Sequence, residues 1–142
     1  MAYNVLIVDD SIPMRGIIKK IIKASGFNVK HFFEAADGNE ALKILNEEWL
    51  DLVLTDYNMP GMNGLELLDE IKKSDTLKSI PVVVITTEGS KQRLVEFFEK
   101  GAMDYIKKPF TPEEIKEKLN LIMGEPQYEE RILDNGDEEL DF

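Results

Sequence analysis

Acidic, hydroxyl and basic side chains stand at or directly after the ends of four apolar runs of this sequence. They are Asp9, Asp10, Asp56, Thr86, Lys107 and Lys108. Carboxylates grouped with a hydroxyl and an ammonium group can hold a divalent cation and the oxygens of a phosphoryl group. Asp56 would then be a nucleophile, and its product would be an aspartyl phosphate. This chemistry requires a fold that brings residues far apart in the sequence together.

Apolar runs that predict strands alternate with segments of helical periodicity. The runs at 5–8, 52–55 and 81–86 are continuous and rich in branched residues, as in parallel strands that are covered on both faces. The runs at 30–35 and 103–106 contain polar residues, which is typical of edge strands. The sequence therefore predicts three inner strands and two edge strands.

Five segments with helical periodicity and recognisable ends separate or follow these runs. The predicted helices cover about 12–24, 38–46, a segment from 64, 90–100 and 112–123. Asn63 and Thr111 are predicted to cap two of them, because each has a glutamate three residues later. The apolar residues expected to form helix faces toward the core include Ile17, Ile18, Ile21, Ile22, Phe97 and Phe98.

Five strands that alternate with five helices predict a doubly wound α/β fold with a parallel sheet. In such sheets the ligand site lies beyond the carboxyl ends of the strands, where the strand order reverses. The six polar residues should therefore meet at one edge, with either Lys107 or Lys108 supplying the ammonium group. Two like charges ~4 Å apart repel by about 4 kcal/mol at an effective dielectric constant of ~20. Mg²⁺ is the expected counterion, because it takes oxygen ligands and keeps several of its waters.

Length and charge divide the chain into one domain, residues 1–123, and an acidic tail, residues 124–142. With 142 residues, of which 43% are hydrophobic, the chain can bury one core. The tail holds eight acidic residues and one arginine, a net charge of −7, which leaves −4 of the total −11 for the domain. Neither part offers the basic stripe that nucleic-acid binding needs.

Composition also narrows the expected location. The sequence contains no cysteine, so it offers no disulfide, thiolate metal site or cysteine nucleophile. It has no apolar run long enough to cross a bilayer, and its first strand begins too close to Met1 for a signal peptide. The expectation is a soluble cytoplasmic protein.

Four segments, taken in order, resemble the receiver domain of two-component response regulators, the CheY-like family. They are VLIVDDS, LVLTDYNMPGMNG, VVVITTEG and YIKKPF. The resemblance covers residues 3 to about 123 and implies the flavodoxin-like strand order 2-1-3-4-5, for which this family is itself an example. Each polar residue alone is more often a helix cap, a turn residue or a surface residue. Their joint occurrence at compatible spacing makes the resemblance specific.

The resemblance implies roles for the acidic residues. Asp10 would ligate Mg²⁺ directly and Asp9 mainly through water. Asp56 would accept the phosphoryl group and also ligate the metal, with the main-chain carbonyl of Asn58 as a further ligand.

It also implies roles for residues of the last two strands. Thr86 and Lys108 would contact phosphoryl oxygens, which selects Lys108 over Lys107. Tyr105 would be an aromatic switch that turns inward when Thr86 moves toward the phosphate. The peptide bond between Lys108 and Pro109 would be cis.

The function implied is that of a phosphoacceptor rather than an enzyme with a separate substrate. A histidine kinase would donate the phosphoryl group, and the signal would leave by protein contact through the face of the fourth helix, fifth strand and fifth helix. The oligomeric state expected is a monomer or a phosphorylation-dependent dimer. Asn58 and Glu88 also occur as a pair in chemotaxis-type relatives, which favours a chemotaxis role with a phosphate that is lost quickly.

Two other classes share part of the pattern. A phosphatase of the haloacid dehalogenase type needs a second acid two residues after its nucleophile, where this sequence has Asn58. A flavodoxin-type cofactor binder needs a phosphate loop rich in hydroxyls after the first strand, where Asp9 and Asp10 stand. The tail is either a solvating acidic segment or a segment that docks on the face bearing Tyr105.

Overall fold

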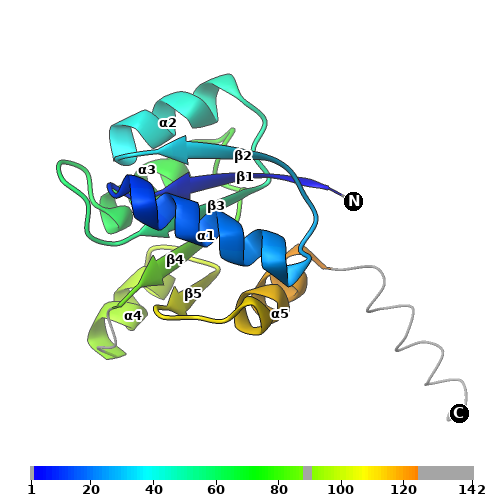
Figure 1. Ribbon diagram of the computed structural model, residues 1–142. Coiled ribbons are helices and arrows are strands. Elements are labelled where there is room, and N and C mark those ends of the chain that lie inside the picture. Colours follow the sequence, from blue (N-terminus) through cyan, green and yellow to red (C-terminus); the bar gives the residue numbers. More distant parts are fainter. Residues whose placement is uncertain (1, 88–90, 125–142) are drawn as a thin grey trace, which may run out of the picture.

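The computed structural model describes residues 2–87 and 91–124 as an alternation of strands and helices (Figure 1). The strands in these residues are β1 (Tyr3–Val8), β2 (Val29–Ala35), β3 (Leu52–Asp56), β4 (Val82–Thr86) and β5 (Asp104–Lys107). The helices are α1 (Ile12–Ser25), α2 (Gly38–Glu47), α3 (Gly64–Lys73), α4 (Lys91–Glu99) and α5 (Pro112–Met123). The predicted elements are confirmed, with ends that differ by one or two residues.

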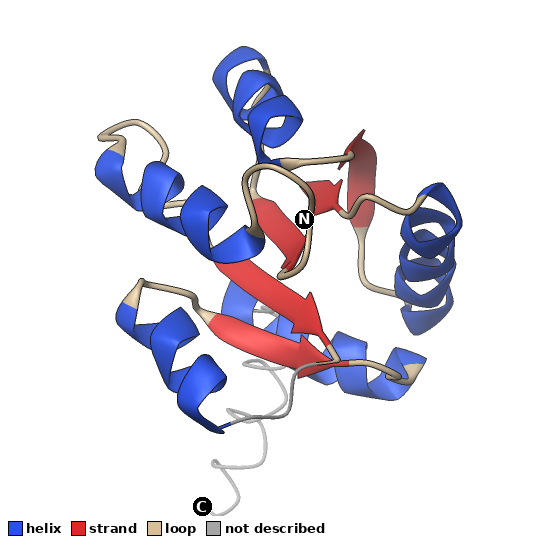
Figure 2. Cartoon of the chain, turned by 90° about the vertical axis from the view of Figure 1, so that its left-hand side faces the viewer, coloured by secondary structure: helices blue, strands red, loops and turns tan. Residues whose placement is uncertain are grey.

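The sheet is parallel throughout and has the order β2-β1-β3-β4-β5, as predicted. The two strands with polar residues, β2 and β5, lie at its edges. Figure 2 looks toward the edge at which the strands end and shows helices on both faces of the sheet. The doubly wound fold class is therefore confirmed.

Each face of the sheet has its own core. On one face, Ile18 and Ile22 of α1 and Leu119 of α5 pack together with the strands. On the other, Leu67 of α3 and Phe97 of α4 belong to the cluster that also includes residues of α2. The core is thus split into two layers, with α1 and α5 on one side and α2, α3 and α4 on the other (Figure 1).

Two apolar residues predicted to face the core are exposed instead. Phe97 is fully buried, but Phe98 is 46% exposed. Similarly, Ile18 is buried and Ile17 is 48% exposed. Neighbouring residues on an α-helix point about 100° apart at 3.6 residues per turn, so a narrow buried stripe accommodates only one of each pair.

The predicted caps are present. Asn63 and Thr111 each accept a hydrogen bond from the main-chain nitrogen three residues later, and the glutamates at those positions return one. Ser11 caps α1 by accepting from Met14. These bonds fix where α1, α3 and α5 begin, and α1 begins directly after the acidic pair at the end of β1.

Gly64 brings the start of α3 against the end of β3. A Cβ atom at this position would lie 2.3 Å from the main-chain oxygen of Asp56. The nitrogen of Gly64 donates to the oxygen of Tyr57 at 2.9 Å, which holds the two segments together. The close approach therefore requires a residue without a side chain.

We expect Gly64→Ala to lower the free energy of unfolding by about 1–3 kcal/mol, because the backbone around Asp56 must move to relieve the overlap. Gly16→Ala is the matched control: its Cβ would meet nothing within 4 Å in the interior of α1. That change should raise stability by about 0.5–1 kcal/mol. Urea unfolding followed by circular dichroism measures both, and equal stabilities for the two variants would contradict the expectation.

The loop that precedes β3 lies at the edge of the sheet opposite the strand ends. Trp49, in the loop between α2 and β3, is 90% exposed. Its main-chain oxygen accepts from the amide of Asn4 at 2.7 Å, and the nitrogen of Asn4 donates to Asp51 at 2.8 Å. These two bonds between side chain and main chain join Asn4 to the loop, and the Trp49 indole stays outside the core.

Across residues 2–87 and 91–124, no helix combines the length and apolar character needed to cross a bilayer.

Candidate functional site

The structure brings the three predicted carboxylates together at the carboxyl edge of the sheet. Asp9, Asp10 and Asp56 each offer an oxygen, and these oxygens lie within 4.8 Å of one another. The register explains the meeting, because Val8 of β1 pairs with Thr55 of β3, and each precedes an acidic residue. Asp9 is buried, Asp56 is partly buried and Asp10 is exposed. The cluster is open to solvent on one side.

The geometry separates the two candidate lysines. The Lys108 ammonium lies 3.5 Å from Asp56 Oδ1 and 3.6 Å from Asp9 Oδ2, and its side chain is 15% exposed. Its peptide bond to Pro109 is cis, as predicted, and its main-chain nitrogen donates to the oxygen of Thr86 at 2.9 Å. Lys107 is an exposed residue at the end of β5. Lys108 is therefore the cation of the site.

Burial raises the pKa of Asp56 above its usual value. The ammonium of Lys108 works against this rise in pKa, whereas the neighbouring charge of Asp9 adds to it. The nitrogen of Tyr57 donates to Asp56 Oδ1 at 2.9 Å and favours the ionised form. The fold thus holds the Asp56 carboxylate where its negative charge is incompletely compensated.

The donor set fits a hard divalent cation. Among the described residues, buried Asp9 Oδ2 has no hydrogen-bond partner, and the Lys108 ammonium lies too far from it for a hydrogen bond. A second positive charge would satisfy this oxygen, and carboxylate oxygens are ligands that Mg²⁺ accepts.

An open hollow of about 490 Å³ adjoins the cluster. It is lined by Asp10, Tyr57, Asn58, Met59, Pro60, Gly61, Asn63 and Arg93. The hollow leaves room at the site for a cation, its waters and the phosphoryl group of a donor. Asn58 lies on its wall, and metal ligation by its carbonyl stays a prediction.

Thr86 and Tyr105 lie where the sequence placed them. Thr86 is buried at the end of β4, and Tyr105 is half-buried on β5, in register with Val84. The Tyr105 ring contacts Phe98 edge-on at 6.2 Å between centroids and has the Lys118 ammonium 5.0 Å from its centre. Exposed Phe98 is thus a partner of Tyr105, and a switching role for Tyr105 stays a prediction.

Two predictions fall outside the described residues. Glu88, which pairs with Asn58 in the chemotaxis argument, lies in the gap at 88–90. The proposed docking segment of the tail, 126–142, lies beyond residue 124. The structure tests neither of them.

Sequence analysis missed Arg15, which contacts the main chain of the acidic pair. Its guanidinium donates to the main-chain oxygen of Asp9 and to Glu34 Oε1, the latter at 2.8 Å. Lys19 also contacts Glu34, at 2.6 Å. A basic residue near the N-terminal end of a helix opposes the helix dipole. The unfavourable position of Arg15 on α1 is therefore a sequence signal that its guanidinium binds a group outside the helix.

The Glu34 cluster should make stability sensitive to acid. Hydrogen bonds from Lys19 and Arg15 hold the pKa of Glu34 below its usual value. A carboxylate with a lowered pKa contributes stability that is complete above the pKa of the unfolded chain and is lost as pH falls through the pKa of the folded chain. From about pH 5 to about pH 3, the thermal midpoint of the wild type should therefore fall more steeply than that of Glu34→Gln.

Glu47→Gln is the control for this comparison, because Glu47 is exposed on α2 and forms no ion pair with any described residue. Circular dichroism at a series of pH values gives the midpoints. An acid response of Glu34→Gln as steep as that of the wild type would show that the cluster adds nothing to stability.

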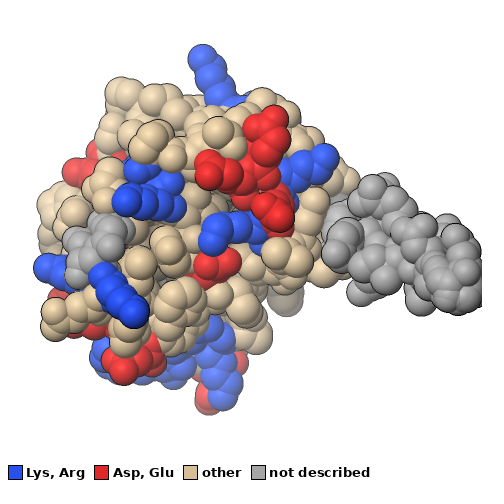
Figure 3. Space-filling model, turned by 90° about the horizontal axis from the view of Figure 1, so that it is seen from below, with Lys and Arg blue, Asp and Glu red and all other residues tan. Residues whose placement is uncertain are grey.

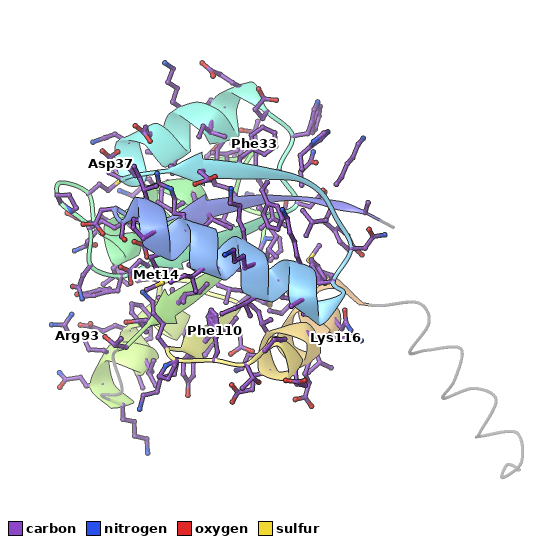
Figure 4. All side chains as sticks on the ribbon, in the orientation of Figure 1. Met14, Phe33, Asp37, Arg93, Phe110 and Lys116 are labelled. Atoms are coloured by element: carbon purple, nitrogen blue, oxygen red, sulfur yellow. The ribbon has the colours of Figure 1, made fainter. Side chains whose placement is uncertain are left out.

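A second contact that sequence analysis missed lies on the other side of the hollow. Arg93, labelled near the start of α4 in Figure 4, stacks on the ring of Tyr57 with 4.9 Å to its centre and donates to the Tyr57 hydroxyl. Tyr57 also packs edge-on against Phe97, at 5.3 Å between centroids. This contact ties α4 to the residue that follows Asp56, and a separation of 36 residues hides it from any local pattern.

Comparison with known proteins agrees with this geometry. The family model for the response regulator receiver domain matches residues 5–120. Chemotaxis protein CheY-3 of Vibrio cholerae is 44% identical over 119 residues, which cover 84% of this chain and 90% of that protein. Chemotaxis protein CheY1 of Helicobacter pylori is 40% identical over 122 residues, which cover 85% of this chain and 97% of that protein.

A solved structure supports the same assignment. That of chemotaxis response regulator CheY4 of Vibrio cholerae aligns with a TM-score of 0.75 and 33% identity, covering 86% of this chain and 99% of that one. The family match spans most of the chain, and the strand order and the cluster of carboxylates with lysine agree with the predicted resemblance. The chain therefore belongs to the family of response regulator receiver domains.

Proposed function

We propose that this chain is a cytoplasmic phosphoacceptor that takes a phosphoryl group from a histidine kinase onto Asp56 and passes the signal on by protein contact. The observation that carries the proposal is the Lys108 ammonium, held 3.5 Å from Asp56 beside two further carboxylates. A structural ion pair needs one acid, whereas this site gathers three. Residues 1–123 form the receiver in this proposal, and 124–142 form the tail.

The proposed reaction is a direct phosphoryl transfer. An oxygen of Asp56 bonds to phosphorus while the bond from phosphorus to the donor nitrogen or oxygen breaks, and the leaving group keeps that electron pair. Lys108 and the Thr86 hydroxyl would balance the charge on the phosphoryl oxygens. Asp9, Asp10, Asp56 and the Asn58 carbonyl would hold Mg²⁺, which when bound supplies positive charge to the same oxygens.

The output surface in this proposal is the face of α4, β5 and α5 around Tyr105. Apolar side chains are exposed there: Val95 by 47%, Phe98 by 46% and Met103 by 55%. Beside them is a shallow hollow of about 280 Å³ lined by Tyr105, Ile106, Lys107, Phe110, Glu114, Glu117 and Lys118. Apolar contacts bordered by charged groups suit a protein target better than nucleic acid.

A chemotaxis role is the part of the proposal that rests on relatives. Two of the similar proteins are named for chemotaxis. The site also has Asn58 where the resemblance favours that type. Phosphorylation would act on a monomer or produce a dimer, and sedimentation with and without the phosphoryl group would distinguish the two.

The metal component predicts a ligand effect on stability. Mg²⁺ should raise the thermal midpoint of the wild type, because it binds the folded site and relieves carboxylate repulsion. Asp10→Asn should reduce the rise, since it removes one ligand from the cluster. Thermal unfolding across a Mg²⁺ series measures the effect, with Asp75→Asn, whose side chain is 95% exposed, as the control. Identical Mg²⁺ responses in the Asp10→Asn variant and the wild type would exclude Asp10 as a ligand.

The test of the proposed function uses acetyl phosphate as the donor. Intact-mass measurement should show the addition of one phosphoryl group in the presence of Mg²⁺ and none when the metal is chelated. Sustained turnover of p-nitrophenyl phosphate would instead favour the phosphatase alternative. If neither the mass increase nor the turnover is observed, the proposed function is wrong.

A further inference from the structure

The surface formed by α1 and the start of β2 is basic in an otherwise acidic chain. Residues 11–33 contain five lysines and arginines and no acidic residue, whereas the whole chain has a net charge of −11. Arg15 and Lys19 are engaged with Glu34. The other three, Lys20, Lys23 and Lys30, are exposed and form no ion pair with any described residue. We call these three residues the basic α1 face.

This face also offers apolar surface. Ile17, in the middle of α1, is 48% exposed, and the Lys23 ammonium lies 5.8 Å from the centre of the half-buried ring of Phe32. Cations beside exposed apolar side chains suit a segment that is both acidic and apolar.

The chain itself contains such a segment. Residues 125–142 carry eight acidic side chains and one arginine, and they also include Tyr128, Ile132, Leu133, Leu140 and Phe142. No other stretch of the sequence is comparably acidic, so the segment is the natural electrostatic partner of the basic α1 face.

The position at which the tail follows α5 favours docking of the tail on α1 of its own molecule. The tail follows α5, which packs beside α1 on the same face of the sheet, and both helices run toward the edge opposite the site (Figure 1). Lys116, labelled on α5 in Figure 4, adds a further exposed cation to this side of the molecule. Eighteen residues extend up to about 60 Å, whereas α1 is only about 20 Å long, so the tail can reach along the whole helix.

The face around Tyr105 is a poorer electrostatic partner. Residues 91–118, which form α4, β5 and most of α5, contain seven basic and six acidic residues. Figure 3 views the molecule from this side and shows acidic and basic side chains interspersed. An acidic tail gains little net attraction there.

We infer that residues 125–142 dock on the basic α1 face of their own molecule. Each exposed ion pair contributes only about 0–1 kcal/mol, but tethering gives the tail an effective concentration in the millimolar range, which lets several weak contacts act together. Because α1 begins beside Asp9 and Asp10, a docked tail would restrict the approach of protein partners along α1 and leave the hollow open to small phosphodonors. This last consequence rests on the proposed function, whereas the docking does not.

The absence of native cysteine allows a direct test on the full-length chain. Asn135→Cys adds one thiol within the tail without changing its charge, and a nitroxide attached there weakens the NMR signals of nearby amides. We expect loss of signal for amides of residues 17–25 and 29–31 and retention for those of residues 98–107. Raising NaCl from 0.1 M to 1 M shortens the Debye length from about 10 Å to about 3 Å and should restore the signals.

Charge reversal supplies the matched comparison. Lys20→Glu combined with Lys23→Glu should abolish the signal loss on α1, whereas Lys43→Glu, at an exposed position on α2, should not. Signal loss centred on residues 98–107, loss that persists in 1 M NaCl, or no loss anywhere would overturn the inference. A mixture of isotope-labelled chains without the nitroxide and unlabelled chains that carry it tests for contact between molecules. Equal signal loss in this mixture would also overturn the inference, because it would place the tail on a second copy. None of these readouts depends on phosphorylation.

Discussion

Asp56→Asn is expected to abolish phosphorylation by acetyl phosphate and at the same time to raise the thermal midpoint of the protein. The first effect follows because the amide is no nucleophile toward phosphorus, so intact-mass measurement should detect no added phosphoryl group. The second follows because burial and Asp9 raise the pKa of Asp56, so its ionised form destabilises the fold at neutral pH. The neutral amide keeps the oxygen that accepts from Tyr57 and removes the repulsion.

The raised pKa of Asp56 also predicts how the stability advantage of Asp56→Asn changes with pH. A raised pKa in the folded chain means that the ionisation of Asp56 lowers stability as pH rises above the usual range of a carboxyl group. The advantage of Asp56→Asn should therefore be small at low pH and complete at neutral pH. The exposed control Asp75→Asn should phosphorylate normally and show no such advantage. A phosphorylated Asp56→Asn protein, or one less stable than wild type at neutral pH, would contradict the assignment.

Lys108→Met is expected to have the largest effect on stability among the site residues. It removes the ammonium that lies between Asp9 and Asp56, whose side chains are 3% and 14% exposed. Breaking a buried ion pair on one side costs about 3–5 kcal/mol, and the partly open site places the expected loss near about 3 kcal/mol. The rate of phosphorylation should fall by roughly 100-fold, as when one donor to a developing oxyanion is removed.

Lys107→Met is the matched control for this variant. It changes the neighbouring residue in the same way at an exposed position and should alter stability by less than about 0.5 kcal/mol. Mg²⁺ should recover more stability in Lys108→Met than in the wild type, because it replaces the missing positive charge. Urea unfolding with and without Mg²⁺ measures both effects, and similar losses in the two lysine variants would show that the ammonium of Lys108 is dispensable.

The inner strands could be predicted because continuous apolar runs have few alternatives in a chain of this size. Once the sheet is known to be parallel, the meeting of Asp9, Asp10 and Asp56 follows from the direction of the strands. The choice of Lys108 over Lys107 required more, because adjacent residues at a strand end point to opposite sides. The family resemblance predicted Lys108, and the Lys108 ammonium lies beside Asp9 and Asp56.

Long-range polar contacts could not be predicted from local patterns in the sequence. Arg15 meets Glu34 across 19 residues, and Arg93 meets Tyr57 across 36. Neither pairing has a periodicity or a spacing that marks it in one sequence. The error at Phe98 has a different source, because hydrophobicity alone does not say which of two adjacent aromatic residues the helix turns inward.

The single tryptophan of the chain gives the molecule a natural spectroscopic reference. Trp49 is 90% exposed and lies on the edge of the sheet away from the acidic cluster. Its indole already meets water in the folded state, so its emission should differ little between folded and unfolded chains. Metal or phosphoryl binding at the far edge should also leave it unchanged. A blue shift of that emission would therefore report a macromolecule that covers the loop between α2 and β3, at the edge of the sheet opposite the acidic cluster.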